Sequence, residues 1–359
     1  MKTSSKVRIH ACEAWWQGWG TCSNAVASTK DLLLLARNKR ILVTGAAGFI
    51  GSHLCERLAG VGHDVLGVDC RTDHYSTELK DLNTECLRDS GVHLDSRDLA
   101  VDEVGTLMGE VEYVFHLAAQ PGISSSTPFD AYLRNNIVAT HRLMEAAIAT
   151  TTLQGFLHIS TSSVYGADAT GDESTEPRPT SYYGVTKLAA EQLVLAAHRE
   201  RNIPSCSLRL FSVYGPRERP EKLYPRLVGS ILEGRPFPLF EGSEKHVRSY
   251  TYVGDIVDGL VAALDNFDSC AGEVFNIGTD VAHTTGEGIE IVQAITGQSA
   301  RFERKPRRAG DQTRTQADIT KARQVLGYDP TTSLGEGLKA VVEWYQSQIL
   351  GRIDLWPSR

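Results

Sequence analysis

The stretch that decides the fold is residues 40–51, R-I-L-V-T-G-A-A-G-F-I-G. Its first part, Arg40–Thr44, is a short apolar, β-branched run that predicts a buried strand. A glycine-rich turn follows at residues 45–51, and residues 52–58 have a helical pattern. The apolar run Asp64–Val68 predicts a second strand, which ends directly before Asp69. The turn is therefore predicted to join a strand to a helix, with an acid closing the next strand.

This order is the context in which a glycine-rich turn binds a dinucleotide. Gly45, Gly48 and Gly51 allow a tight turn and a close approach of the backbone to a pyrophosphate, and the helix N-terminus offers N–H groups to that anion. Asp69 can accept hydrogen bonds from the hydroxyls of the adenosine ribose, and its charge would repel a 2′-phosphate. We therefore expect the cofactor to be NAD rather than NADP.

A second motif, Y-G-V-T-K at residues 183–187, opens a predicted helix that continues to residue 197. Tyr183 and Lys187 are four residues apart and so share one helical face. An ordinary tyrosine has a pKa of about 10 and is a poor base at neutral pH. A nearby ammonium group and the positive nicotinamide ring would stabilise the phenolate and lower that pKa. Tyr183 could then accept a proton from a substrate hydroxyl, while Lys187 would also hold the nicotinamide ribose.

With the spacing G-x-x-G-x-x-G in T-G-A-A-G-F-I-G, followed by Y-x-x-x-K, the chain resembles the extended short-chain dehydrogenase/reductase family and its NAD-dependent epimerase/dehydratase members. The alternation of apolar runs and helical patterns predicts an α/β fold, a Rossmann-type doubly wound parallel sheet, with a smaller C-terminal mixed α/β substrate domain. We expect an NAD-binding domain at 38–215 and a nucleotide-sugar-binding domain at 216–350, with some later segments returning to the first. Residues 1–37 are expected to be a poorly ordered N-terminal extension.

The resemblance also implies which residues contact the cofactor and which perform the chemistry. Catalysis is assigned to Tyr183 and Lys187, with Thr161 at the Ser/Thr position that assists the tyrosine. The implied cofactor-binding residues are Gly45, Gly48, Phe49, Ile50, Gly51, Asp69, Asp95, Ser96, Leu117, Ala118, Ala119, Asn136, Tyr183 and Lys187.

The end of the strand before residue 162 discriminates among reactions. Sugar-nucleotide 4,6-dehydratases typically carry T-D-E-V-Y-G here, and their two acids move the protons of water elimination. UDP-glucuronate decarboxylases typically carry T-S-E-V-Y-G. This chain has T-S-S-V-Y-G at residues 161–166. Without those carboxylates, the expected reaction is 4-epimerisation of a UDP-sugar through a 4-keto sugar, which needs only the tyrosine and NAD.

The substrate side favours UDP-glucuronate. Residues 208–220, L-R-L-F-S-V-Y-G-P-R-E-R-P, resemble a stretch of the UDP-glucuronate 4-epimerases, and residues 236–242 resemble their uracil-packing segment. Hydroxyls can bind a carboxylate without adding charge, and arginine forks suit a diphosphate. The implied substrate-binding residues are Thr161, Ser162, Ser163, Ser212, Arg219, Arg248, Arg308 and Asp311.

One difference from the sequence pattern of close relatives leaves other substrates and activities open. After Gln120, Pro121 and Gly122, close relatives often place V-R-x-S, whereas residues 123–126 of this chain are I-S-S-S. A substrate-side arginine is then missing, which leaves UDP-glucose or an N-acetylated sugar as possible substrates. UDP-glucose 4-epimerase, UDP-glucuronate decarboxylase and a non-catalytic NAD-binding regulator remain the alternatives.

Composition narrows the class of protein. The chain has 359 residues and a formal net charge of −7, which argues against nucleic-acid binding. It lacks a run of about 20 apolar residues, so we expect no membrane span. Its seven cysteines show neither C-x-x-C pairs nor zinc spacing, so we expect no metal site and a cytoplasmic location. Amphipathic helices at about 130–149 and 183–199 would form a homodimer interface in relatives.

Overall fold

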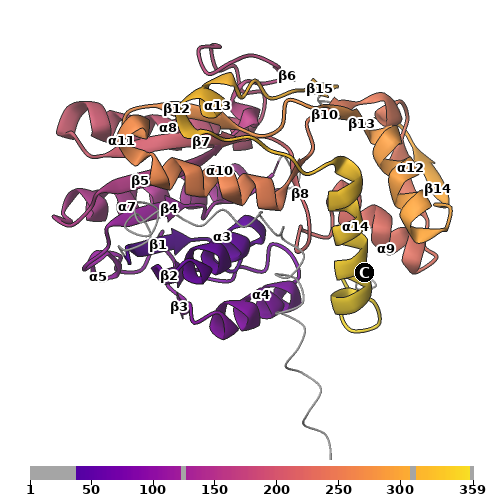
Figure 1. Ribbon diagram of the computed structural model, residues 1–359, viewed down its shortest axis with the longest axis horizontal. Helices are drawn as coiled ribbons and strands as arrows, with labels where there is room; N and C mark the ends of the chain where they lie inside the picture. Colours follow the sequence, from indigo (N-terminus) through magenta and orange to yellow (C-terminus); the bar gives the residue numbers. More distant parts are fainter. Residues whose placement is uncertain (1–37, 123–126, 308–312, 356–359) are drawn as a thin grey trace, which may run out of the picture. The chain divides into compact units, whose positions relative to one another are not determined.

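One parallel sheet organises the described part of the chain (Figure 1). The computed structural model describes residues 38–122, 127–307 and 313–355, so the predictions for residues 1–37, Arg308 and Asp311 lie outside it. Seven strands pair in parallel in the order β12-β7-β5-β4-β1-β2-β3. They are β1 (Arg40–Thr44), β2 (Asp64–Val68), β3 (His93–Asp95), β4 (Tyr113–His116), β5 (Gly155–Thr161), β7 (Ser205–Leu210) and β12 (Val274–Ile277).

The strand order reverses between β1 and β4, which are neighbours although β2 and β3 lie between them in the sequence. In open parallel sheets, ligands bind outside the carboxyl ends of the strands at such a reversal. The predicted doubly wound parallel sheet is confirmed. Its reversal places the ends of β1 and β4, at Thr44 and His116, on either side of the expected binding crevice.

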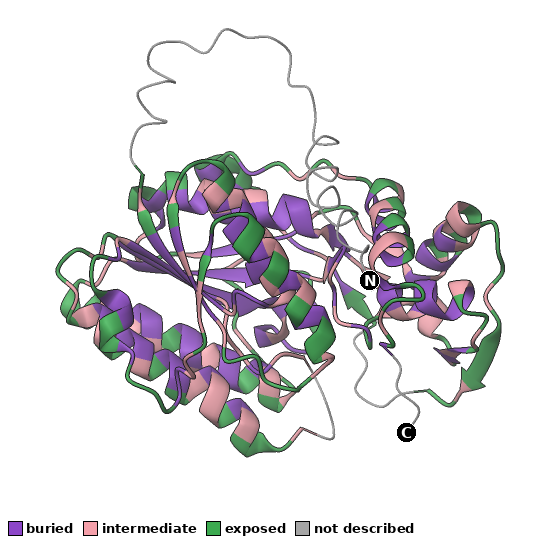
Figure 2. Cartoon of the chain, turned by 90° about the horizontal axis from the view of Figure 1, so that it is seen from below, coloured by how far each residue is buried: buried purple, intermediate pink, exposed green. Residues whose placement is uncertain are grey.

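Alternate residues of each strand face opposite helix layers. Leu42 and Val114 belong to a core that includes Val194 of α8 (Tyr182–Arg201), whereas Ile41 and Phe115 belong to a separate core on the other face. All seven residues of β5 and all six of β7 are buried, as expected for a sheet covered on both faces. Figure 2 shows the buried strands at the centre and exposed residues on the outer sides of the helices.

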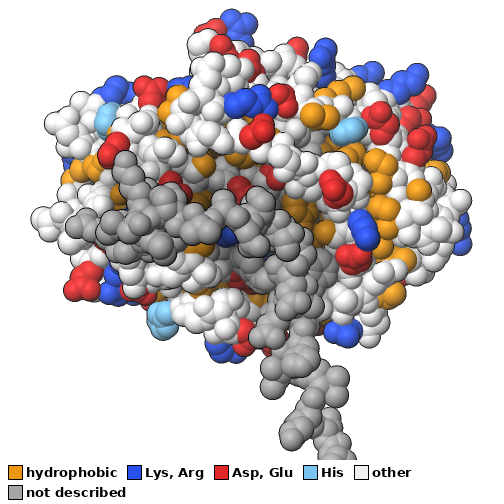
Figure 3. All heavy atoms as spheres, viewed as in Figure 1, with side chains coloured by type: hydrophobic (Ala, Val, Ile, Leu, Met, Phe, Trp, Pro, Cys, Tyr) orange, Lys and Arg blue, Asp and Glu red, His pale blue; other side chains and the backbone are white. Residues whose placement is uncertain are grey.

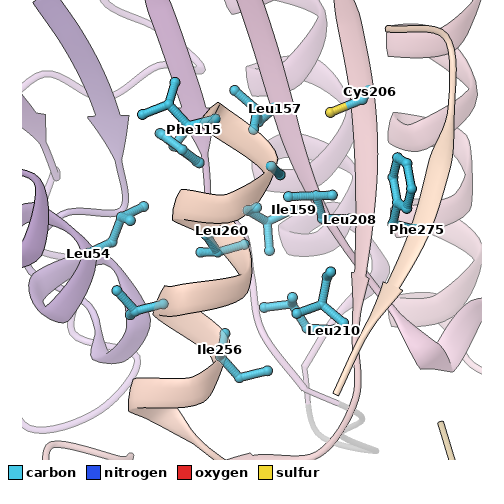
Figure 4. Packing of buried hydrophobic residues seen from close by; sticks show 14 of the residues in the cluster. Leu54, Phe115, Leu157, Ile159, Cys206, Leu208, Leu210, Ile256, Leu260 and Phe275 are labelled. Atoms are coloured by element: carbon cyan, nitrogen blue, oxygen red, sulfur yellow. The ribbon is translucent and has the colours of Figure 1, made fainter. Parts of the chain in front are cut away.

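Helices α3 (Phe49–Gly60) and α10 (Val253–Asp265) cover one face of this sheet. In Figure 4, Leu54 of α3 and Ile256 and Leu260 of α10 lie over strand residues that include Phe115 and Leu208. Since α10 begins at Val253, a segment late in the sequence completes the core around the first strands. Residues on both sides of position 215 therefore share one hydrophobic core, while the proposed division into domains stays a prediction.

The remaining elements complete the two layers and the substrate side. The helices are α3 (Phe49–Gly60), α4 (Thr77–Asp89), α5 (Gly105–Met108), α6 (Phe129–Tyr132), α7 (Ala139–Ile148), α8 (Tyr182–Arg201), α9 (Leu223–Leu232), α10 (Val253–Asp265), α11 (Phe267–Cys270), α12 (Thr285–Thr296), α13 (Thr320–Leu326) and α14 (Leu334–Trp344). Two segments are π-helical, η1 (Leu133–Val138) and η4 (Tyr345–Ile349). Two are 3₁₀-helical, η2 (Ser162–Val164) and η3 (Ser243–Lys245).

Short strands form three smaller sheets. One has the order β13-β10-β15-β6, and the others pair β11 with β8 and β14 with β9. These strands are β6 (Asp168–Ala169), β8 (Val213–Tyr214), β9 (Phe237–Phe240), β10 (Val247–Arg248), β11 (Thr251–Tyr252), β13 (His283–Thr284), β14 (Phe302–Lys305) and β15 (Arg314–Thr315).

Local signals set the helix boundaries near the motifs. The first helix, α3, begins at Phe49 inside the glycine-rich turn rather than at residue 52. The helix α8 begins at Tyr182 because the Ser181 hydroxyl accepts a hydrogen bond from the Gly184 N–H. It ends at Arg201, and the residue that caps it, Asn202, has the left-handed conformation. Asn136, expected on a regular helix, lies in the π-helical turn η1.

Candidate active site

The glycine-rich turn is shaped for close approach of its backbone. Gly45 has a φ of +72°, and a Cβ there would lie 2.9 Å from the Ala118 amide nitrogen. A Cβ on Gly51 would overlap the Gly45 carbonyl oxygen, and one on Gly48 would lie 3.0 Å from it. A side chain at Gly45 or Gly51 would therefore require the backbone of the turn to shift, and one at Gly48 would be in tight contact. It leads into α3, whose first residues, Phe49 and Ile50, start the helix where a pyrophosphate would meet its N–H groups.

Asp69 is fixed at the end of β2. Its Oδ2 accepts a hydrogen bond from the Ala47 N–H at 3.1 Å, and its Oδ1 accepts one from the Arg71 N–H at 2.7 Å. The carboxylate thus ties the glycine-rich turn to the loop after β2. It also borders a cavity of about 320 Å³ whose other lining residues are Arg71, Thr84, Arg88, Val92, His93, Leu94 and Ser96. The cavity brings two predicted cofactor residues, Asp69 and Ser96, together.

The loop after β4 is anchored to β1. The Leu117 and Ala118 amides donate to the backbone oxygen and hydroxyl of Thr44 at 3.3 and 3.1 Å, and Ala119 continues the same loop. Asn136 is fully buried, and its Oδ1 accepts from the Gln120 N–H at 2.7 Å. Asn136 therefore shapes the backbone beside the predicted cofactor site.

Asp95 has a partner within the protein. Its carboxylate accepts hydrogen bonds from the Arg97 side chain, which holds the pKa of Asp95 below its ordinary value. It lies at the end of β3, beside β2, with which it pairs through Val68. Asp95, a predicted cofactor-binding residue, thus lies beside the end of β2, and its charge is already engaged by Arg97.

Tyr183 and Lys187 occupy the first two turns of α8. Lys187 is only 3% exposed, and burial lowers its pKa to about 7, although the negative charge of Glu191 opposes this shift. Burial also raises the pKa of Tyr183, which the Thr161 hydroxyl and the charge of Arg219 oppose. The expectation that Lys187 lowers the pKa of Tyr183 is not met in the protein without cofactor. That pKa lies above its ordinary value, and Thr161 and Arg219, rather than Lys187, oppose the effect of burial.

Hydroxyl groups gather where β5 ends. Thr161 is the last residue of β5, and its Oγ1 accepts a hydrogen bond from the Ser163 N–H at 3.2 Å and lies 3.3 Å from the Ser163 Oγ. Ser162 and Ser163 form the turn η2 that follows. Since β5 pairs with β7, Ser212 lies just beyond the end of the neighbouring strand. The four predicted hydroxyl residues therefore share one edge of the sheet.

Arg219 lies beside groups from two other parts of the chain. Its Nη1 is 2.8 Å from the Glu221 carboxylate and 3.2 Å from the Nε2 of His74, and its side chain is 12% exposed. Arg248 lies on β10, beside β13 and β15 in the four-stranded sheet. The structure gives both arginines a position, whereas Arg308 and Asp311 lie outside the described residues.

Similar proteins identify the family. A sequence model of the NAD dependent epimerase/dehydratase family matches residues 41–278. The chain belongs to this family. It is 38% identical to an uncharacterized UDP-glucose epimerase, YtcB, of Bacillus subtilis over 87% of this chain and 99% of that protein. It is 33% identical to UDP-glucuronate 4-epimerase 2 of Arabidopsis thaliana over 85% of this chain and 75% of that protein.

A solved structure agrees with this membership. The UDP-glucuronic acid 4-epimerase of Bacillus cereus, in complex with UDP-glucuronic acid and NAD, has a TM-score of 0.81 and 39% identity. The match covers 86% of this chain and 99% of that chain. Membership of an NAD-dependent enzyme family confirms the predicted cofactor. The narrow glycine turn and the buried lysine of this chain fit that cofactor.

Sequence reasoning missed a polar layer under α8. The Arg209 side chain of β7 donates to Glu191 at 2.6 and 3.0 Å and to the Tyr165 hydroxyl at 2.8 Å. The glutamate could have been found, because it follows Lys187 at the same four-residue spacing by which Lys187 follows Tyr183. Its partner could not, since β7 meets α8 only in the folded chain.

The residues that the structure describes hold neither a metal-binding cluster nor a membrane-spanning helix. Among them, no group of three or more His, Cys, Asp or Glu side chains has the arrangement of a metal site. The described helices also include none that is long and apolar enough to cross a bilayer. On the described part of the face in Figure 3, acidic and basic side chains are interspersed.

Proposed function

We propose that the protein is an NAD-dependent 4-epimerase that interconverts UDP-glucuronate and UDP-galacturonate through a 4-keto sugar. The observation that carries the proposal is the group formed by Tyr183, Lys187 and Thr161, with hydroxyls instead of carboxylates at Ser162 and Ser163. Such a site can move one proton at a sugar hydroxyl, but it lacks the second acid and base that elimination of water requires.

The protein's own groups have distinct tasks in this reaction. When bound, NAD⁺ would supply the hydride acceptor for C4 of the sugar, and the NADH so formed would be the donor to the opposite face after the sugar has turned. Tyr183 accepts the proton of the C4 hydroxyl, and the Thr161 hydroxyl favours its phenolate form. The Lys187 ammonium adds positive charge one turn away on the same helical face. Tyr183 gives the proton back to the C4 oxygen in the second half of the cycle.

Glucuronate makes a further demand on the site. A 4-keto sugar with a C5 carboxylate is a β-keto acid and tends to lose CO₂. The protein must hold that carboxylate in an orientation that disfavours the cleavage. Ser162 and Ser163 offer hydroxyls without adding negative charge. The Arg219 guanidinium, which lies 2.8 Å from the Glu221 carboxylate, offers a positive charge. The Arabidopsis and Bacillus cereus relatives with UDP-glucuronate in their names support this assignment.

UDP-glucose is the second candidate substrate. The similarity to the Bacillus subtilis protein named as a UDP-glucose epimerase favours it. To separate the two, the purified protein is incubated without added NAD with each nucleotide sugar, and the products are resolved by NMR. UDP-galacturonate from UDP-glucuronate, with little CO₂, supports the proposal. UDP-galactose from UDP-glucose alone would contradict the glucuronate assignment.

A tyrosine variant separates catalysis from cofactor binding. Tyr183→Phe should lose turnover while retaining bound NAD, because the phenol oxygen moves the proton but the ring keeps its place on α8. Full activity of this variant would contradict the mechanism. Loss of NAD together with activity would instead point to a structural role. This test also addresses the alternative of a non-catalytic NAD-binding regulator.

We also propose that the protein is a homodimer, formed through α8 and the segment containing α6, η1 and α7. Phe129 and Tyr182 stack edge to face with their ring centroids 5.2 Å apart, yet they are 41% and 59% exposed, and Val185 is 45% exposed. An apolar surface of this kind is suited to a second copy. Analytical ultracentrifugation should give a dimer for the wild type and a monomer for Val185→Glu; a monomeric wild type would contradict the interface.

A cytoplasmic location stays part of the proposal. Cys55, Cys206 and Cys270 are buried thiols, as in proteins of reducing compartments. Cell fractionation with an antibody to the native protein tests this location, and recovery in an oxidising compartment would contradict it.

A further inference from the structure

His74 connects three parts of the candidate site. It lies on the loop that follows β2, five positions after Asp69. One face of its environment is the Arg219 guanidinium, whose Nη1 lies 3.2 Å from Nε2 of the imidazole. The other is the Gln120 side-chain amide, whose Nε2 lies 2.9 Å from Nδ1 and 3.3 Å from Nε2 of the imidazole. The motifs of the sequence gave no reason to select this residue.

These contacts determine the protonation of the ring. A guanidinium can only donate hydrogen bonds, so the Nε2 that faces Arg219 must carry a lone pair. The neutral ring then bears its proton on Nδ1, which needs an acceptor. A half-turn of the Gln120 amide presents Oε1 at that place, and the two ends of an amide are interchangeable in shape. With the amide in that orientation, the neutral His74 ring accepts from Arg219 at Nε2 and donates from Nδ1 to Gln120.

The contact bears on the position of Arg219 relative to the catalytic tyrosine. A Cβ on Gly122 would lie 2.9 Å from Nη2 of Arg219, so the guanidinium lies directly against the Gly122 backbone. The Gly122 carbonyl accepts a hydrogen bond from the Tyr132 hydroxyl at 2.8 Å. The Tyr132 and Tyr183 rings are 6.4 Å apart. His74 thus restrains the Arg219 guanidinium, which is separated from Tyr183 by Gly122 and Tyr132.

We propose that His74 is a positioning residue for substrate selection: by accepting a hydrogen bond from Arg219, it holds the guanidinium ready for the carboxylate of a uronate sugar. The inference rests on the proposed function, because UDP-glucuronate carries this carboxylate and UDP-glucose does not. Without the acceptor, Arg219 keeps Glu221 as its partner at 2.8 Å and turns toward that exposed carboxylate.

The charges around His74 make its function depend on pH. The groups that face it are Arg219, Glu221, Lys80 and Asp73, and burial and then Arg219 lower the pKa of the imidazole. The ring is therefore neutral at pH 7. As the pH falls through the lowered pKa, which lies below the ordinary 6.5, the ring gains a proton, loses its acceptor and repels Arg219. Selection for the uronate should weaken in the same range.

Two variants of the full protein with its bound NAD test the proposal. His74→Leu removes the acceptor, and His74→Asn keeps an amide oxygen that can accept from Arg219. Both are assayed for KM and kcat with UDP-glucuronate and UDP-glucose between pH 5.5 and 8.5. We expect His74→Leu to raise KM for UDP-glucuronate about tenfold more than KM for UDP-glucose, the scale of one charge-assisted hydrogen bond. His74→Asn should recover most of the difference and lack the acidic rise in KM.

An equal effect of His74→Leu on both substrates, or no effect, would overturn the positioning role. A second measurement does not depend on turnover: the pKa of His74 is followed by NMR in the wild type and in Arg219→Met. Removal of the guanidinium should raise this pKa, and an unchanged value would overturn the contact itself. If the wild type epimerises neither sugar, the proposed function fails, while the NMR result still decides whether the two side chains interact.

Discussion

The Glu191 carboxylate and the Arg209 guanidinium form an ion pair whose side chains are 0% and 4% exposed, one helical turn beyond Lys187. Arg209 donates two hydrogen bonds to this carboxylate, at 2.6 and 3.0 Å. The charge of Glu191 in turn raises the pKa of Lys187 against the effect of burial. A structural ion pair therefore supports the charge of Lys187, a predicted catalytic residue.

Removing one partner of this ion pair should destabilise the protein more than replacing both partners. Glu191→Met or Arg209→Met alone leaves one buried charge without its partner, and each should lower the free energy of unfolding by about 3–5 kcal/mol. The double variant removes both charges and should recover part of that loss. Denaturant unfolding of all four proteins measures the coupling. Strictly additive effects would show that the two side chains do not interact.

Lys187→Met should abolish turnover yet stabilise the cofactor-free protein. Burial lowers the pKa of Lys187 from 10.5 to about 7, so the folded state carries the unfavourable ammonium fully below pH 7. That penalty is relieved as the pH rises from about 7 to 10.5. The gain in Tm should therefore be larger at pH 6 than at pH 9. A destabilised variant at pH 6 would contradict the burial of this charge.

Thr161→Val should shift the pH dependence of the reaction. The Thr161 hydroxyl lowers the pKa of Tyr183, so its removal raises that pKa further. We expect kcat at pH 7 to fall about 10- to 100-fold and to recover partly as the pH rises. Thr161→Ser keeps the hydroxyl and serves as the matched control. A pH profile identical in shape to that of the wild type would count against the interaction.

Gly51→Ala should release NAD and reduce stability. The new Cβ would overlap the Gly45 carbonyl oxygen, and only a shift of the backbone turn can relieve the overlap. Gly335→Ala is the control, because it also lies in a helix but has open space around its Cβ. The control should be neutral or gain about 0.4–1 kcal/mol. Bound NAD per protein and Tm are measured, and retention of NAD by Gly51→Ala would disprove a tight turn.

The sequence predicts what depends on short segments. The strand Arg40–Thr44 and the strand Asp64–Val68 have the predicted bounds, because an apolar run between turn signals specifies a buried strand locally. The spacing of Tyr183 and Lys187 likewise needs only a helix. Their placement beside Thr161 follows from the topology of the family.

The rest depends on contacts between distant residues. His74 and Arg219 are far apart in the chain, and no periodic pattern indicates that a loop after β2 would meet a loop after β8. The raised pKa of Tyr183 and the lowered pKa of Lys187 follow mainly from burial, which is a property of the packed layer under α8. Neither the composition of the chain nor the spacing of its motifs predicts the contact between His74 and Arg219 or these two pKa shifts.

The strand β12 has a consequence for how the chain is made. It closes the sheet beside β7, yet it is synthesised after α9 and α10. A growing polypeptide that has emerged only as far as residue 215 would present β7 as an unprotected sheet edge, and all six residues of that strand are buried in the finished protein. During the interval between translation of β7 and of β12, the nascent chain is therefore open to misassociation at this edge.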